Sequence, residues 1–275
     1  MKTLLKVTFF VLLMAGCSRL QLGMDAGSGM EDKDYNDDWK VLEAFKREAD
    51  ADDLRQSIDF LNSHTGDIEK LFEWNDDEYG FLHYAAAIGN LGLVKELVKR
   101  KVPVDIKTPK KGKTPLLIAI VEGHLEVAKY LVDKGANVYE KDANGASALH
   151  YAAMSGQLDM FQYVDSMMNK EKQYTPRKDN NGSTLLHLAA LSGGLELTKD
   201  ILEKYGDSML QKENNGGYIP LHFAAAMKNR DMVELFIKYG ANKTIEQDKR
   251  YSAARIAKKK GCHDIAELIL DAGQN

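Results

Sequence analysis

The residues best suited to chemistry are histidines, and four of the seven recur at similar spacing: His83, His150, His187 and His222. A row of imidazoles could bind metal or move protons. On neighbouring packed helices, however, they would lie ~8–10 Å apart, whereas zinc holds its nitrogen ligands within ~2.0–2.1 Å. One histidine per helix cannot readily share an ion with the next, and Leu117 interrupts the row. We therefore expect no metal site and no cofactor.

A second candidate for chemistry is the run Cys262-His263-Asp264. Adjacent residues on a turn point in different directions, so adjacency alone does not form a nucleophile–base pair. No phosphate loop, dinucleotide fingerprint, His-Glu-x-x-His or nucleophile elbow occurs. The sequence predicts no catalytic residue, no small-molecule substrate and no enzyme activity.

Composition excludes further classes of protein. The chain has 37 basic and 41 acidic residues, a net charge of -4, whereas proteins that grip nucleic acid are usually basic. We therefore expect no nucleic-acid partner. Cys17 and Cys262 are the only cysteines, too few for a disulfide framework or a multi-cysteine zinc site.

The elements that position these residues repeat along the chain. A block of the type Leu-His-x-Ala-Ala begins at Leu82, Leu116, Leu149, Leu186 and Leu221, and a degenerate copy begins at Ala254. The steps between these starts are 34, 33, 37, 35 and 33 residues. Such a period is typical of repeat proteins, in which no unit has a core of its own and stacking supplies one.

The copy from Thr114 to Gly135 predicts the structure of each unit. Thr114 suits a helix cap, Pro115 the first helical position and Gly123 a left-handed end. A second helix ends at Gly135, and its expected inner face comprises Leu125, Ala128, Leu131 and Val132. Glycine recurs at two positions of the repeat. One position holds Gly89, Gly123, Gly156 and Gly193, and the other holds Gly112, Gly145, Gly182 and Gly217.

These motifs, most fully residues 112–123, 135–136 and 240–241, resemble the ankyrin repeat. The resemblance implies an all-α repeat solenoid whose histidines make structural hydrogen bonds to the loop backbone and to the threonine of the signature. Extra residues near Asn169–Arg177 and Tyr205–Leu210 depart from the pattern and predict longer loops. The repeats are expected at about residues 76–108, 109–142, 143–179, 180–213, 214–248 and 249–275, the last as a polar cap.

The N-terminal segment is typical of an export signal. Lys2 and Lys6 precede a short apolar run, and Leu13-Met14-Ala15-Gly16-Cys17 resembles the lipobox of bacterial lipoproteins. That resemblance implies removal of residues 1–16 and a lipid anchor on Cys17, on the periplasmic side of the outer membrane because Ser18 rather than Asp follows. A plain cleaved signal, giving a secreted or soluble periplasmic protein, is the alternative. Residues 17–38 predict a flexible tether and residues 39–75 an N-terminal pair of capping helices.

The resemblance also implies a concave face that binds proteins. Its candidates are Tyr79, Ile88, Val121, Met154, Leu191, Tyr218 and Met227. The alternative is that some of them pack between repeats. Lysines in two runs, Lys107–Lys113 and Lys258–Lys260, favour either an acidic partner or ordinary solvated surface.

The sequence therefore predicts a monomeric, membrane-tethered protein-binding module. Its role would be that of an adaptor or neutraliser of another protein in the bacterial cell envelope. A structural envelope scaffold and a host-directed ankyrin effector are the alternatives.

Overall fold

The computed structural model describes residues 80–169, 178–241 and 247–272. These ranges hold twelve α-helices, one 3-10 helix and no strand. The predicted fold class, an all-α repeat solenoid, is confirmed. The predicted signal, tether and N-terminal capping helices, together with Cys17 and Tyr79, lie outside the described residues. Among the helices described, none is both long enough and apolar enough to cross a membrane.

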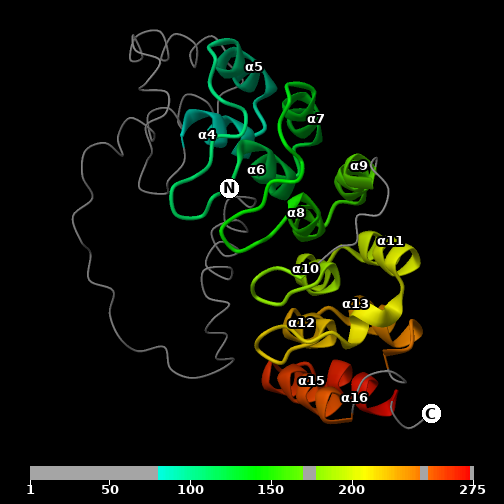
Figure 1. Cartoon of the computed structure of the whole chain (residues 1–275). Helices are drawn as coiled ribbons and strands as arrows, with labels where there is room; N and C mark the ends of the chain where they lie inside the picture. Colours follow the sequence, from blue (N-terminus) through cyan, green and yellow to red (C-terminus); the bar gives the residue numbers. More distant parts are fainter. Residues whose placement is uncertain (1–79, 170–177, 242–246, 273–275) are drawn as a thin grey trace, which may run out of the picture. The chain divides into compact units, whose positions relative to one another are not determined.

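Internal contacts divide the chain into two units, Met1–Asn137 and Val138–Asn275. The described part of the first unit consists of two helix pairs: α4 (Phe81–Ala87) with α5 (Leu91–Lys99), and α6 (Pro115–Glu122) with α7 (Leu125–Asp133). The first helices of the two pairs, α4 and α6, pack together, and so do the second helices, α5 and α7 (Figure 1). Each pair thus uses the other to bury its apolar residues.

The second unit continues this arrangement. Its first helices are α8 (Ala148–Ser155), α10 (Leu185–Ser192), α12 (Pro220–Ala226) and α15 (Gln247–Lys259), and each contacts the next in this order. Its second helices are α9 (Leu158–Met168), α11 (Leu195–Tyr205), α13 (Arg230–Lys238) and α16 (His263–Asp271), which also contact one another in order (Figure 1). Alanine pairs on the first helices are fully buried, which lets neighbouring helices approach closely.

The pair α6–α7 shows how the sequence sets the helix ends. The Thr114 hydroxyl accepts a hydrogen bond from the Leu117 N–H at 3.3 Å, Pro115 is the first helical residue and Gly123 ends α6 with φ 81°. These expectations are confirmed. On α7, however, the buried residues are Val127, Ala128 and Leu131, whereas Leu125 and Val132 are only partly buried. The buried face of α7 is therefore rotated relative to the predicted one, because the packing of α7 on its neighbours decides which side chains are buried.

The second predicted insertion is not a simple loop. After α11, residues Asp207–Gln211 form a 3-10 helix, η3, that contacts α11 and α12. Leu210 is buried there, which gives the extra residues an apolar anchor. Of the first insertion, Asn169 follows the end of α9, and residues 170–177 lie outside the described part.

A turn follows each first helix. The residue seven positions after the start of the Leu-His-x-Ala-Ala block has a left-handed backbone in this turn. This position holds Gly89, Gly123, Gly156, Gly193, Lys228 and Gly261, with φ between 58° and 81°. Only glycine adopts this region without steric cost, so Lys228 (φ 58°) is the strained member of the series. Lys101 (φ 70°) is strained in the same way, at the position that Gly135 and Gly240 occupy in other repeats.

We expect Lys228→Gly to stabilise the protein by about 1 kcal/mol, because glycine relieves the left-handed strain at little cost in exposed contacts. Thermal unfolding followed by circular dichroism would measure the gain. The control is Lys228→Ala, which removes the charge but keeps Cβ and therefore the strain. Equal stability of the Gly and Ala variants would contradict this explanation.

Candidate functional site

The recurring histidines hold the first helices to the loops. In unit one, His83 Nε2 donates toward the carbonyl oxygens of Ile106 and Lys113, each at 3.0 Å. In unit two, His187 Nε2 donates to the Tyr218 carbonyl at 2.9 Å, and its Nδ1 accepts from the Thr184 N–H at 3.1 Å. The structural role that the resemblance implied is confirmed for these side chains.

The two remaining members of the row follow the same pattern at Nδ1. His150 Nδ1 accepts from the Ser147 N–H at 3.2 Å, and His222 Nδ1 accepts from the Ile219 N–H at 3.1 Å. Burial lowers the pKa of His83 and of His187 to about 4. Those two imidazoles are therefore neutral near pH 7 and bonded to the backbone, a poor state for a proton-transfer group.

The Cys262-His263-Asp264 run does not assemble into a catalytic set. Cys262 precedes α16, and its backbone N–H donates to the Ala257 carbonyl at 2.9 Å. Asp264 turns to Arg230, whose Nη1 donates to its Oδ2 at 3.0 Å; this hydrogen bond is the main cause of the lowered pKa of Asp264. The carboxylate is thus committed to a neighbouring repeat rather than to His263.

The surface candidates separate into two positions on the helix. Val121, Met154 and Leu191 lie five residues after the motif begins, whereas Ile88 and Met227 lie six residues after it. Met154 and Leu191 are only 8% exposed, so the structure corrects their placement on an exposed strip; they match the packing alternative. A step of one residue turns a helix by about 100°, which is enough to move a side chain from packing to solvent.

The outward position, which we call the rim position, holds Ile88, Glu122, Ser155, Ser192, Met227 and Lys260. Met227 is 42% exposed, and Ile88 is partly buried. The hydroxyls of Ser155 and Ser192 donate to carbonyls of their own helices, at 2.8 and 3.0 Å from the Ala152 and Ala189 oxygens. The rim is therefore mixed in character, not the continuous apolar strip predicted from the sequence.

Tyr218 lies beside the first helices of unit two. Its ring meets the rings of His222 and Phe223 edge to face, with centroids 5.4 and 6.4 Å apart. The side chain is partly buried. Tyr218 thus stiffens the loop before α12 and leaves only part of its ring available to a partner.

In unit one the rim position is held by Glu122, an acid whose pKa is raised. Burial raises the pKa of Glu122 to about 7, and the nearby Lys113 ammonium lowers it in part. Lys113 belongs to the lysine-rich loop, so one positive charge of that loop acts on Glu122. Glu122 is consequently close to half protonated near neutral pH, so the charge at the rim position of unit one depends on pH.

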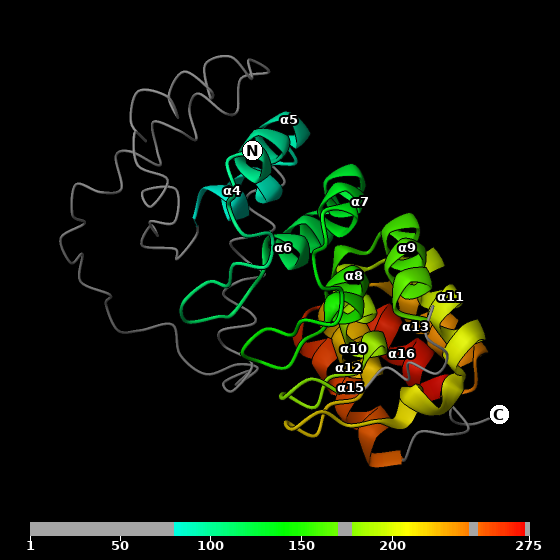
Figure 2. The same ribbon diagram turned by 45° about the horizontal axis from the view of Figure 1, so that its top comes forward.

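The loops that precede the first helices of unit two are joined by asparagines. The Asn180 N–H donates to the Asn144 carbonyl at 2.8 Å, and the Asn215 N–H donates to the Asn181 carbonyl at 2.9 Å. The Asn215 amide adds a bond to the Asn180 carbonyl at 2.8 Å. Figure 2 shows these loops extending on the same side of α8, α10 and α12. The ladder holds the loop tips in one register, which preorganises the surface beside them.

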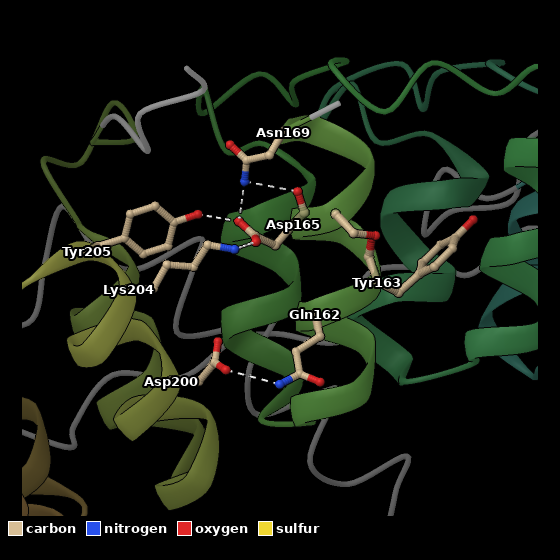
Figure 3. Close-up of polar contacts among 8 residues, drawn as sticks. Gln162, Tyr163, Asp165, Asn169, Asp200, Lys204 and Tyr205 are labelled. Carbon is tan, nitrogen blue, oxygen red and sulfur yellow. Dashed lines mark hydrogen bonds and ion pairs between the residues drawn. The ribbon is translucent and has the colours of Figure 1, made fainter. Parts of the chain in front are cut away.

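The second helices of unit two are joined by a buried carboxylate (Figure 3). Asp165 on α9 is 3% exposed and pairs with the Lys204 ammonium and the Tyr205 hydroxyl, both from α11. The Asn169 amide donates to Asp165 Oδ1 at 2.7 Å and also to the Asp165 carbonyl at 3.0 Å. Each polar side chain of this cluster is bonded to Asp165, so we interpret the cluster as a structural link between α9 and α11.

Among the described residues, no three His, Cys, Asp or Glu side chains are grouped so as to hold a metal ion. Similarity to known proteins agrees with the helical repeats. The chain matches the family described as ankyrin repeats (three copies) over residues 60–142, 82–175, 136–212, 164–248 and 186–275. This chain belongs to the ankyrin-repeat family. Ankyrin repeats generally bind proteins, so the array is a protein-interaction module.

The relatives of this ankyrin protein differ widely in their names. It is 32% identical over 167 residues to a probable E3 ubiquitin-protein ligase XBOS32 of Oryza sativa, covering 58% of this chain and 31% of the relative. It is 38% identical over 71 residues to the phosphocholine transferase AnkX of Legionella pneumophila, covering 26% of this chain and 8% of that protein. The putative ankyrin repeat protein FPV223 of fowlpox virus is 29% identical over 148 residues, which is 54% of this chain and 99% of the viral one.

The chain thus spans about a third of the rice relative and less than a tenth of the Legionella one. The feature that this chain has in common with these relatives is the ankyrin-repeat array.

Two loop aspartates of the ankyrin array occupy the same repeat position but differ in their partners. Asp142 Oδ2 accepts from the Tyr151 hydroxyl at 3.0 Å, and its Oδ1 accepts from the Ala146 N–H at 2.7 Å. Asp179 Oδ1 accepts from the Ser183 N–H at 2.7 Å, but Leu188 stands where Tyr151 would be. Within the described part of the chain, Asp179 Oδ2 is buried without a hydrogen-bond partner. Burial accordingly raises the pKa of Asp179.

We expect Asp179→Asn to be at least as stable as wild type at neutral pH, with a gain of up to about 1 kcal/mol. Because the folded-state pKa of Asp179 is raised, the charged carboxyl destabilises the fold above that pKa, and wild-type stability increases as the pH falls through it. The variant should lose this part of the pH dependence in urea unfolding. The control, Asp142→Asn, should instead lose about 1 kcal/mol; a greater loss for Asp179→Asn would contradict the assignment.

Sequence reasoning missed the functional details that depend on side-chain environment. The asparagines of the loop ladder were not among the predicted candidates, although they recur at two adjacent loop positions, Asn144 with Asn181 and Asn180 with Asn215. Glu122 was not among the predicted candidates, because the burial that raises its pKa is not visible in the sequence. Asp165, Lys204 and Tyr205 carried no local signal, because they meet only when α9 and α11 pack together.

Proposed function

We propose that this protein is a membrane-tethered adaptor or neutraliser that captures another protein of the bacterial cell envelope. The ankyrin array supplies the binding surface, and the lipobox-like sequence ending at Cys17 supplies the tether. The rim positions are the surface that a partner would contact, because they project from the first helices beside loops already held in register.

The observation that carries the proposal is that the recurring polar residues of the array form hydrogen bonds to the loops. The recurring histidines and the loop asparagines are engaged in bonds that hold the loops in place. A surface preorganised in this way loses little conformational entropy on binding a folded partner. Met227, the exposed apolar residue of the rim, would be a natural anchor, since methionine adapts its shape to a partner.

Affinity capture from envelope extracts, followed by binding measurements with the purified partner, tests the protein-binding part. Met227→Glu should weaken binding by at least about tenfold. Tyr139→Ser is the matched control, because Tyr139 is 41% exposed but lies on a different loop. A partner that binds both variants and wild type alike would overturn the rim as the binding surface.

Membrane fractionation tests the tether separately. The full chain should be recovered with membranes, and Cys17→Ser should move it to the soluble fraction because a lipid anchor needs the cysteine sulfur. Unchanged membrane association of Cys17→Ser would overturn the lipid anchor while leaving the binding module intact.

A host-directed effector is the second candidate. Its support is the similarity to the Legionella protein, which covers only 8% of that protein. Secretion into the medium, or into host cells during infection, with no membrane-bound pool would favour the effector over the envelope adaptor.

A further inference from the structure

The rim of unit two ends in a cluster of cations. We define the basic end rim as Met227 and Lys228 of the fifth repeat with Lys259 and Lys260 of the sixth. All four side chains are exposed. No acidic residue occurs from Ser252 to Cys262, and Arg255 and Lys258 add charge to the same helix.

Contacts in the preceding repeats show which residues of the end rim are neighbours. A Cβ placed on Gly156 would lie 3.2 Å from Ser192 Oγ, and one on Gly193 would lie 3.3 Å from Asn229 Nδ2. The turn position of one repeat thus adjoins the rim position, or the residue two beyond it, in the next repeat. Because α12 packs on α15 in the same series, we infer from this register that Lys228 adjoins residues 260–262, a segment that begins with Lys260.

The ammonium groups of Lys228 and Lys260 are not engaged by carboxylates of the described structure. Neither Lys228 nor Lys260 makes an ion pair with any described residue. The carboxylates of Glu234 and Asp264 are both bonded to Arg230, at 2.8 and 3.0 Å. Like charges held side by side repel, and an anionic partner would relieve that repulsion.

The backbone provides an independent observation. Lys228 holds φ at 58°, where the equivalent positions hold glycine. A strained residue is retained where its side chain does something that the unstrained residue could not. Here the side chain adds a cation next to Met227, the exposed methionine of the rim.

We propose that the basic end rim binds a short acidic segment of a partner protein, with an apolar residue of that segment resting on Met227. This inference rests on the proposed protein-binding function and names the chemistry of its partner. A short segment fits better than an extended polyanion, because the chain as a whole carries a net charge of -4 and would repel nucleic acid or an anionic bilayer beyond the rim.

The test uses the full-length protein in detergent and a short fluorescein-labelled peptide of Glu and Asp with one central Leu. Fluorescence anisotropy should show binding that weakens as salt is added. Lys228→Gly should weaken it about fivefold, and Lys228→Gly combined with Lys260→Ala by more than about tenfold. Because Lys228→Gly relieves strain, its binding loss should accompany a higher unfolding temperature, which separates the effect from misfolding.

Lys101→Gly is the matched control, since it relieves the same strain and removes the same charge in the other unit. It should leave peptide affinity unchanged. Equal affinity of wild type and the double variant would overturn the proposal, as would tighter binding of single-stranded DNA or phosphatidylglycerol vesicles than of the peptide.

The partner recovered by affinity capture distinguishes this inference from the broader function. If that partner binds Lys228→Gly/Lys260→Ala as well as wild type but loses affinity for Met227→Glu, the acidic segment is overturned and the protein-binding function stands. If it binds all three equally, the acidic segment and the rim as the binding surface are both overturned.

Discussion

Asp165→Ala should lower the unfolding free energy by about 3 kcal/mol, a large effect for one residue of a repeat array. The carboxylate is 3% exposed and joins α9 to α11 through Lys204, Tyr205 and Asn169. Its removal leaves the partly buried Tyr205 hydroxyl without this acceptor and leaves the Asn169 amide with only the Asp165 carbonyl. Lys204, with its side chain 46% exposed, can return to water, which limits the loss. Urea unfolding followed by circular dichroism would measure the change.

The same two helices offer a control for this prediction. Gln162 of α9 donates to Asp200 of α11 at 3.0 Å in an exposed position (Figure 3). Gln162→Ala should cost less than about 0.5 kcal/mol, because exposed polar contacts exchange readily with water. If Asp165→Ala cost no more than Gln162→Ala, the buried cluster would not be the tie between these helices.

Gly194→Ala should also destabilise the protein by about 3 kcal/mol, through a steric clash. A Cβ at this position would lie 2.6 Å from the Gly156 oxygen and 2.9 Å from the Gly156 Cα. Both are backbone atoms, so no side-chain rotation can relieve the contact, and α8 and α10 must separate locally. Gly194 has φ -71°, which alanine adopts freely, so the loss would report the close approach alone.

Gly261→Ala separates this clash from the conformational role of glycine. Gly261 has φ 79°, but a Cβ added there would meet no atom within 4 Å, so the substitution should cost only about 1 kcal/mol of backbone strain. Thermal unfolding of the two variants side by side gives the comparison. A Gly194→Ala variant as stable as Gly261→Ala would show that the backbones can move apart at little cost.

The sequence alone determined the repeating architecture. Leu-His-x-Ala-Ala blocks, capping residues such as Thr114 and glycines such as Gly123 act over a few residues, so their consequences can be read locally. The structural role of the histidines followed from the family resemblance and is confirmed by the bonds of His83 and His187. These features depend on helix geometry that every repeat shares.

Only the tertiary structure decided which side chains face solvent or meet across repeats. Met154 and Met227 occupy adjacent positions in the motif, yet Met154 is 8% exposed and Met227 is 42% exposed, because exposure depends on the packing around each side chain. Asp165 and Tyr205 are 40 residues apart and meet only through the packing of α9 on α11. Local patterns specify helices and turns, whereas exposure, charge pairing and pKa depend on the neighbours that stacking brings together.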